Sequence, residues 1–167
     1  VERYKFIDGV RIKERGALQF EKNIQDDYIK FVSLAESAVN KVSVGIVGLI
    51  TSNGYVDNPT LRGLRKSLLD SFNKIKIVDL HGNMNRGDST EEGKDENVFE
   101  IANVGTSIAI FLKLTSEKEK PRSVGLASVK GEREKKYDLL LGPLAGLNVI
   151  QGIRPSPELY QFKDVDD

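Results

Sequence analysis

A strand–helix–strand pattern within residues 44–80 constrains the fold of this 167-residue chain more than any other feature. Residues 44–50 (VGIVGLI) are apolar and β-branched at alternate and adjacent positions, which predicts a strand buried on both faces. Asn58 and Pro59 combine a capping side chain with a proline at the first helical position, and residues 75–80 form a second strand. Because such a crossover is nearly always right-handed, it predicts two parallel strands in an α/β fold.

Further elements are predicted on both sides of this unit. Apolar residues three and four apart predict a helix from Asp26, and residues 104–114 (VGTSIAIFLKL) predict a long strand. Shorter patterns predict a strand over residues 123–130 and a helix over residues 132–141, followed by an extended, irregular tail. Residues 1–25 show no clear periodicity. The order of elements predicts a three-layer α/β sandwich with few strands.

Composition excludes several classes of protein. The longest apolar stretch has seven residues, whereas a membrane-spanning helix needs about 20. The chain has no cysteine and one histidine, which excludes disulfides, thiolate metal sites and a multi-histidine metal centre. Lys+Arg and Asp+Glu both number 25, so a uniformly basic surface for nucleic acid is excluded, although opposed patches can cancel. We expect a cytoplasmic protein with no membrane segment and no metal.

The chain carries no familiar nucleotide-binding motif. Neither GxxxxGK[ST] nor a GxGxxG turn after a strand is present. The first residue is Val1, and the single methionine is Met84. Because a reading frame begins with methionine, we expect the chain to be a piece of a longer protein.

Polar side chains follow both predicted parallel strands. Asn53 and Tyr55 follow the first strand, and His81 follows the second. In open α/β sheets, residues just beyond the carboxyl ends of the strands face the ligand crevice. Asn53 and His81 are therefore candidates to hydrogen-bond a ligand, and Tyr55 is a candidate to stack on one. A plain turn and a capped strand end are the alternative interpretation of the same residues.

Charges are segregated along the chain. Arg62, Arg65 and Lys66 lie off the apolar stripe of the predicted helix over residues 59–72, and they form a candidate stripe for phosphate contacts. A solvated helix face is the alternative. Residues 88–100 are mostly acidic, and their spacing matches no calcium-binding loop, so we interpret them as a solvated, mobile loop.

Four stretches, taken in order, resemble a known family. They are DDYIKFVSLAE, VGIVGLITSNGYVDNPTLRGLRKSLLDSF, IKIVDLHGN and KDENVFEIANVGTSIAIFLK. Together they resemble the later half of DNA adenine-N6 methyltransferases, in particular the methyltransferase region of large single-chain restriction–modification enzymes. The resemblance covers about residues 1–140 and continues weakly through GEREKKYDLL and PELYQF.

The resemblance implies an incomplete Rossmann-like methyltransferase sandwich. Residues 1–141 would supply the C-terminal half of the sheet, with an antiparallel strand at its edge, and residues 142–167 would lead towards a target-recognition domain. The family binds S-adenosylmethionine at its early strands and presents the target adenine from an Asn/Asp-Pro-Pro-Tyr/Phe motif. This chain has neither feature. We therefore expect no catalytic residue and no bound cofactor here, and S-adenosylmethionine only in the intact parent.

The resemblance also implies a role for one aromatic residue. In the family, an aromatic side chain just before the seventh strand stacks on the extruded adenine, and the matching residue is Phe99. Plugging the edge of the sheet is the alternative role for this ring. Asn53, Tyr55 and His81 are expected on the same target-base side.

The resemblance thus implies an inactive fragment of a restriction–modification methyltransferase. Its partners would be double-stranded DNA and the remainder of the methyltransferase core, with Arg62, Arg65 and Lys66 at the DNA backbone. The alternatives are a non-catalytic DNA-binding or assembly module, and an independent α/β enzyme that uses His81 and Asn53.

Overall fold

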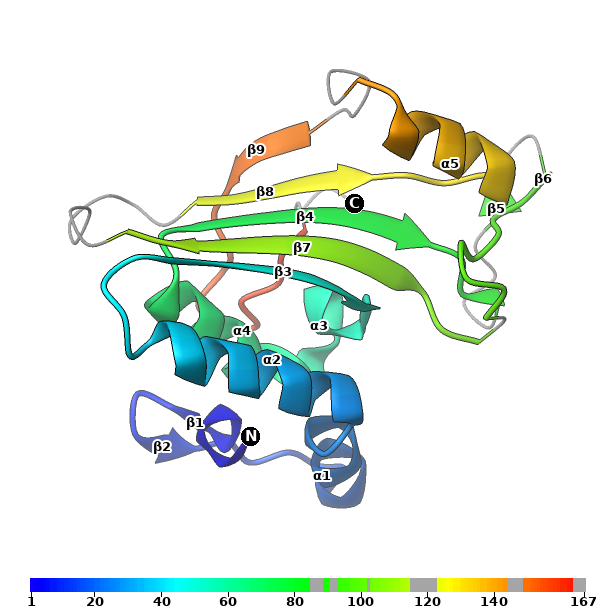
Figure 1. The fold of residues 1–167 in the computed structure, drawn as a ribbon. Coiled ribbons are helices and arrows are strands. Elements are labelled where there is room, and N and C mark those ends of the chain that lie inside the picture. Colours follow the sequence, from blue (N-terminus) through cyan, green and yellow to red (C-terminus); the bar gives the residue numbers. More distant parts are fainter. Residues whose placement is uncertain (85–88, 91–92, 102, 115–122, 144–148, 164–167) are drawn as a thin grey trace.

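A five-stranded mixed sheet forms the centre of the molecule (Figure 1). The computed structural model describes residues 1–84, 89–90, 93–101, 103–114, 123–143 and 149–163. In spatial order the strands are β3 (Gly45–Ser52), β7 (Thr106–Lys113), β4 (Lys74–His81), β8 (Ser123–Ser128) and β9 (Val149–Ile153). Only β4 and β8 pair in parallel, and the other three pairings are antiparallel.

The predicted parallel strands are present, but they are not neighbours. β3 and β4 run in the same direction because each pairs antiparallel with β7, which lies between them. At one edge of the sheet lies β9, an antiparallel strand, which comes from the tail that the sequence predicts to be irregular. The tail is extended as predicted, but it is not irregular over Val149–Ile153, where it pairs with β8. Ile153 and Phe162 are buried in the main core.

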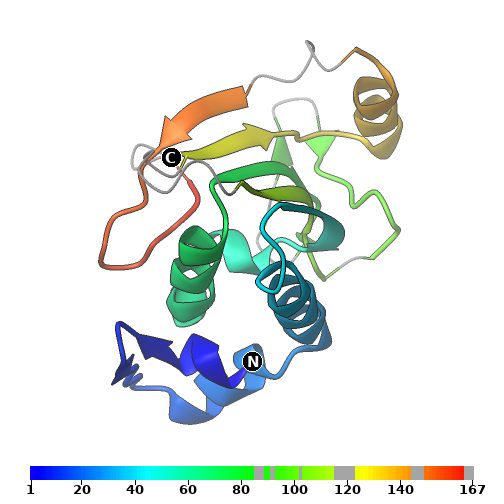
Figure 2. The ribbon, with the colours of Figure 1, turned by 60° about the vertical axis from the view of Figure 1, so that its left-hand side comes forward.

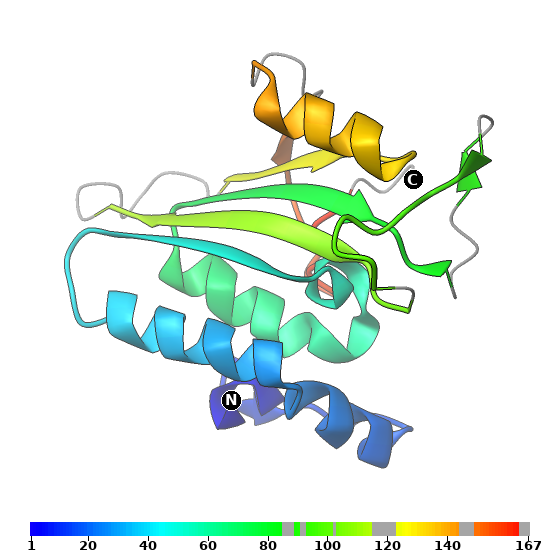
Figure 3. The same ribbon diagram turned by 45° about the vertical axis from the view of Figure 1, so that its right-hand side comes forward.

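Helices cover the two faces of the sheet unequally (Figures 1 and 3). One face carries α2 (Asp27–Val39), α3 (Gly54–Asp57) and α4 (Arg62–Ser71), with α1 (Ala17–Ile24) beyond α2 on the side away from the sheet, whereas the other face carries α5 (Arg133–Leu141). The predicted Asn58 cap is formed: its side chain accepts from the Thr60 amide before η2 (Pro59–Leu61). The Asp26 side chain likewise accepts from the Tyr28 amide at the start of α2. The predicted three layers are therefore present, and in the described residues the third is a single helix. No helix among them is both long and apolar enough to cross a bilayer.

The hydrophobic core is divided between the two faces. The larger cluster lies between the sheet and the four helices, and it includes Ile29, Leu64, Leu68, Phe72, Ile77 and Phe111. The rings of Phe72 and Phe111 are 5.3 Å apart. The smaller cluster lies under α5 and contains Leu80, Val98 and Val129, with Leu139 and Leu140 packed against it. Burial of each large apolar side chain stabilises the fold by about 1.5–3 kcal/mol.

An ordered arm precedes the helices, although the sequence shows no clear periodicity there. It consists of η1 (Glu2–Lys5) and a hairpin of β1 (Phe6–Ile7) and β2 (Val10–Arg11). Figure 2 shows the arm beneath α2 and α4, on the side away from the sheet. A second small hairpin, β5 (Ser89–Thr90) with β6 (Gly93–Lys94), lies beyond β4 in a region predicted to lack structure.

One face of β3 is bare in the described structure. Ile46 and Ile50 are 68% and 57% exposed, whereas Val47 and Leu49 between them pack onto the main core. Ile110 of β7, which pairs with Gly48, extends this exposed apolar face. The prediction of a strand buried on both faces is therefore wrong, because β3 is an edge strand and no described element covers that side.

Candidate functional site

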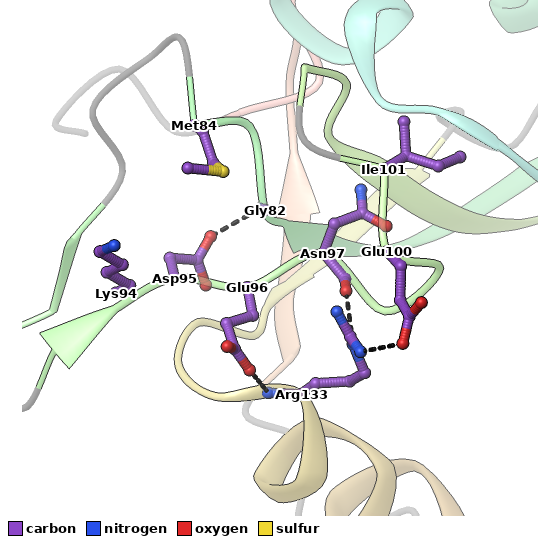
Figure 4. A pocket seen from close by; sticks show the side chains of 9 residues that line it. All are labelled: Gly82, Met84, Lys94, Asp95, Glu96, Asn97, Glu100, Ile101 and Arg133. Carbon is purple, nitrogen blue, oxygen red and sulfur yellow. Dashed lines mark hydrogen bonds and ion pairs between the residues drawn. The ribbon is translucent and has the colours of Figure 1, made fainter.

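A pocket of about 430 Å³ opens where β4 ends (Figure 4). Its lining comes from the turn after β4, from the segment that follows β6 and from the start of α5. The lining residues are Gly82, Met84, Lys94, Asp95, Glu96, Asn97, Glu100, Ile101 and Arg133. Among the described residues, no group of three or more carboxylate or histidine side chains is placed to bind a metal ion.

Asp79 links the two polar residues predicted to follow the parallel strands. Its Oδ1 accepts a hydrogen bond from Asn53 Nδ2 at 2.9 Å and another from the His81 backbone amide at 3.0 Å. Asn53 is buried, and a Cβ at Gly105 would lie 2.5 Å from the Asn53 side chain. The structure therefore links the Asn53 side chain and the His81 backbone through Asp79, and the Asn53 amide is enclosed.

His81 has an uncommon backbone conformation at the end of β4. Its φ is +49°, where the β4–β7 register shifts, and a non-glycine residue rarely adopts that region. Its ring Nε2 lies 2.7 Å from Ser128 Oγ at the end of β8. The ring is partly exposed, so among the predicted polar residues it is the one with access to solvent at this edge.

Tyr55 lies in the core rather than at the pocket. Its hydroxyl is 3.2 Å from Ser107 Oγ, and its ring centroid is 6.5 Å from that of Tyr28. Burial raises the pKa of the Tyr55 hydroxyl, because the phenolate would be desolvated. The structure does not place this ring where it could stack on a base, since stacking requires an exposed face.

The predicted phosphate-contacting stripe is not formed. Arg65 is fully buried: its Nη1 donates to the carbonyls of Tyr55 and Asn58 at 2.9 and 2.8 Å, and its Nη2 donates to the Leu159 carbonyl at 2.6 Å. Desolvation lowers the pKa of the Arg65 guanidinium to about 10. This residue joins α4 to the C-terminal segment and does not face DNA in this structure.

The other two cations of the stripe pair with carboxylates. Arg62 forms an ion pair with Glu14, and Lys66 lies 2.6 Å from Asp70 and 3.2 Å from Asp8. Phosphate contacts require exposed cations, whereas the Arg62 and Lys66 side chains are each 20% exposed and have carboxylate partners. The assignment of these two side chains to phosphate contacts stays a prediction.

A buried ion pair lies beside the pocket, and the sequence reasoning missed it. The side chains of Asp95 and Lys136 are both 0% exposed, and Lys136 Nζ lies 2.7 Å from Asp95 Oδ1. The prediction of a solvated loop over residues 88–100 is therefore wrong for Asp95. Residues 85–88 and 91–92 lie outside the described structure.

Phe99 is presented to solvent from a hydrogen-bonded turn. Its backbone amide donates to Asn97 Oδ1 at 2.7 Å, and Asn97 Nδ2 donates in turn to the Val104 carbonyl and to Thr106 Oγ1. The Phe99 side chain is 52% exposed, so it does not plug the edge of the sheet. Ile101 and Met84 at the pocket are also exposed.

No protein-family model and no curated protein matches the chain. Solved structures do match. The chain aligns with DrdV in a complex with DNA at a TM-score of 0.69 and 22% identity, over 86% of this chain and 14% of that one. It also aligns with the nuclease-deletion mutant of the Type ISP restriction–modification enzyme LlaGI, in complex with a DNA substrate mimic. That alignment has a TM-score of 0.69 and 22% identity, and it covers 83% of this chain and 13% of that one.

A third solved structure matches with a similar TM-score and identity. The ATP-dependent Type ISP restriction–modification enzyme LlaBIII bound to DNA aligns at a TM-score of 0.65 and 23% identity, over 83% of this chain and 9% of that one. At this identity the likeness establishes the fold. The chain therefore shares its fold with one segment of each of three much longer proteins, two of which are Type ISP restriction–modification enzymes.

Proposed function

We propose that this chain is the target-base side of a DNA adenine-N6 methyltransferase within a restriction–modification enzyme. The observation that carries the proposal is Phe99, an exposed aromatic ring on a hydrogen-bonded turn beside the pocket at the carboxyl end of β4. The likeness to three proteins solved with DNA supports it, as does the ordered resemblance of the four sequence stretches.

The chemistry explains why an exposed ring is needed. The adenine amino group is inaccessible inside a duplex, so an enzyme that modifies it must first extrude the base. An aromatic side chain holds an extruded base by stacking, which contributes about 1–3 kcal/mol. His81, partly exposed at the same edge of the sheet, would hydrogen-bond the base or its sugar–phosphate.

The methyl donor belongs to another part of the enzyme. S-adenosylmethionine is held in this family by a glycine-rich turn after a strand, and the sequence of this chain has no such turn. The residues present do not fit that cofactor. We expect the chain alone neither to bind it tightly nor to methylate DNA.

The bare face of β3 is the proposed contact with the remainder of the methyltransferase core. An edge strand offers unpaired backbone N–H and C=O groups, and a contiguous exposed apolar face marks an interaction surface. Ile46, Ile50 and Ile110 supply that face. α2 lies beneath β3, as Figure 3 shows, and its Phe31 and Leu34 are exposed as well. Strands of the missing part would extend the sheet beyond β3.

The two alternative functions have less support. A DNA-binding module that relies on the basic helix needs free cations, but Arg65 is buried and Lys66 is paired. An independent enzyme that uses His81 and Asn53 needs both groups at an open site, but Asn53 is buried against Asp79. His81 Nδ1 is also 3.9 Å from Asp79 Oδ2, too far for the hydrogen bond that would orient a catalytic base.

Methylation by the complete protein tests the proposal. The whole reading frame that contains this sequence, purified and incubated with unmethylated genomic DNA and S-adenosylmethionine, should produce N6-methyladenine in a nucleoside digest analysed by mass spectrometry. The Phe99→Ala variant should methylate about 10- to 100-fold more slowly, the loss expected from one stacked base. Phe6→Ala, which removes an exposed ring from the N-terminal arm, is the matched control and should retain the wild-type rate.

Two results would contradict the proposal. One is the absence of N6-methyladenine from DNA treated with the complete protein. The other is a Phe99→Ala enzyme with the wild-type rate that still extrudes the base, as reported by the fluorescence of 2-aminopurine placed at the target position.

A further inference from the structure

Three segments distant in sequence meet at the Asp95–Lys136 ion pair. Lys136 Nζ donates to Asp95 Oδ1, to the Leu80 carbonyl and to the Glu96 carbonyl, the last two at 2.6 Å. An ammonium group has three N–H donors, so each has an acceptor. Asp95 accepts in addition from the backbone amides of Gly82 and Gly131 at 2.5 and 2.8 Å. The pair thus joins the end of β4, the segment after β6 and the turn before α5.

Full satisfaction distinguishes this pair from a surface salt bridge. A buried ion pair is costly to desolvate, and it tolerates burial only with good geometry and further hydrogen bonds. Here no polar side-chain atom buried in the described structure lacks a partner. Loss of either charge leaves the other buried without its counter-ion, so this junction specifies one arrangement of the three segments.

Backbone packing makes the same junction rigid. Gly82 has a φ of +84°, and a Cβ on it would lie 2.5 Å from the Cα of Asn97. The turn after β4 and the segment that carries Phe99 are therefore in direct backbone contact. Neither can move toward the other without a clash.

One face of α5 binds three consecutive carbonyls of that segment. Lys136 donates to the carbonyl of Glu96, and Arg133 Nε donates to that of Asn97 at 2.9 Å. The Tyr137 hydroxyl donates to that of Val98 at 2.6 Å. Residues three and four apart lie on the same face of a helix, so the three donors match the spacing of 133, 136 and 137. The contact from Arg133 is visible in Figure 4.

We infer that α5 is the positioning element for Phe99: Arg133, Lys136 and Tyr137 fix the backbone of residues 96–98 and thereby set the direction of the Phe99 ring. These are positioning residues, since none of them needs to touch the base. The inference rests on the proposed function for its use in base stacking, but the fixing of Phe99 is a property of this chain and is measurable without DNA.

A tryptophan in place of Phe99 reports directly on the local freedom of this position. The natural chain has no tryptophan, so Phe99→Trp in the full 167-residue chain introduces one indole, which is excited at wavelengths where the five tyrosines do not absorb. In the Phe99→Trp background, Tyr137→Phe and Lys136→Met should raise the constant for acrylamide quenching of the indole about twofold to fivefold, because residues 96–98 then open locally. The same variants should lower the residual fluorescence anisotropy of the indole. Lys136→Arg, which keeps the charge, should restore part of the order.

A control separates positioning from general destabilisation. Glu36→Gln disrupts a buried hydrogen-bond network on the far side of the sheet, so it should lower the melting temperature and leave quenching of the introduced indole in the folded chain unchanged. Tyr137→Phe removes one partly exposed hydroxyl and should fold even if Lys136→Met does not.

The outcomes distinguish this inference from the proposed function. A more mobile indole when Tyr137→Phe is combined with Phe99→Trp supports the inference, whether or not the complete protein methylates adenine. Unchanged quenching and anisotropy in folded Tyr137→Phe and Arg133→Gln chains overturn it. Methylation by the complete protein tests the proposed function separately: there Tyr137→Phe should lower kcat without raising KM for S-adenosylmethionine.

Discussion

Gly82 follows His81 at the end of β4 in a left-handed conformation, with no space for a side chain. We predict that Gly82→Ala destabilises the chain by about 2 kcal/mol or more, because strain at positive φ adds to overlap with the Asn97 backbone. Gly9→Ala is the matched control: its φ is +81°, but nothing lies within 4 Å of the added Cβ. This variant should lower the free energy of unfolding by about 1 kcal/mol, the contribution of backbone strain at positive φ alone. Urea denaturation measures the free energy of unfolding of both variants, and an equal decrease in the two would contradict the steric argument.

Arg65 shows how a cation can serve the fold rather than a ligand. Its planar guanidinium reaches three backbone carbonyls on two segments, and a lysine ammonium cannot reproduce that geometry. We predict that Arg65→Lys lowers the free energy of unfolding by about 2–4 kcal/mol. Arg62→Lys, on the same helix and partly exposed, should lower it by less than about 1 kcal/mol. A comparable loss in both variants would refute the buried role.

Among the elements, Glu36 of α2 connects the N-terminal arm to α4. Its carboxylate is buried and accepts hydrogen bonds from Arg3, Tyr4, Ser67 and Ser71. Burial by itself would raise the pKa of Glu36, but these hydrogen bonds outweigh it and hold the pKa below its ordinary value of 4.5. This buried carboxylate therefore contributes to ordering the arm, a region that the sequence left open as a helix or an ordered arm.

The lowered pKa of Glu36 makes its contribution to stability depend on pH. An acid with a depressed folded pKa stabilises the fold above its unfolded pKa, and this contribution is lost as pH falls through the folded value. We predict that Glu36→Gln costs about 2–4 kcal/mol near neutral pH. The difference from the wild type should shrink below pH 4.5. Urea titrations at a series of pH values measure the difference in free energy of unfolding between the variant and the wild type. A difference that stays constant down to acidic pH would rule out the ionised carboxylate as its source.

At the scale of the whole molecule, the exposed face of β3 should govern the solution behaviour of the chain. Ile46 and Ile50 lie on an edge strand whose backbone is unpaired on one side. We predict that the isolated chain self-associates, and that Ile46→Lys with Ile50→Lys reduces this in sedimentation velocity. Leu18→Lys, which replaces an even more exposed apolar residue on α1, should have little effect. If both changes act alike, the association does not depend on this face.

Much of the local structure could be predicted from the sequence. The Asn58 cap is formed as predicted, the helix predicted from Asp26 is α2, and the strands over 75–80 and 104–114 are present as β4 and β7. The β1–β2 hairpin also had a signal, Asp8-Gly9, because a two-residue turn of that composition favours positive φ at both positions. The Phe99 ring is exposed, and Asn53 and His81 both bond to Asp79, but the roles assigned to these residues from the sequence stay predictions.

By itself, therefore, the sequence determined the longer helices and strands between residues 26 and 141 and the Asn58 cap, because periodicity and capping depend on neighbours a few residues away. Only the tertiary structure decided that β7 lies between β3 and β4, that Arg65 and Tyr55 are buried, and that Asp95 pairs with Lys136. Nothing in the sequence around Arg65, Asp95 and Lys136 distinguishes these charged residues from charged residues that lie in solvent. Their burial depends on acceptors contributed by distant segments, such as the Leu159 carbonyl for Arg65, and those segments meet only when the chain folds.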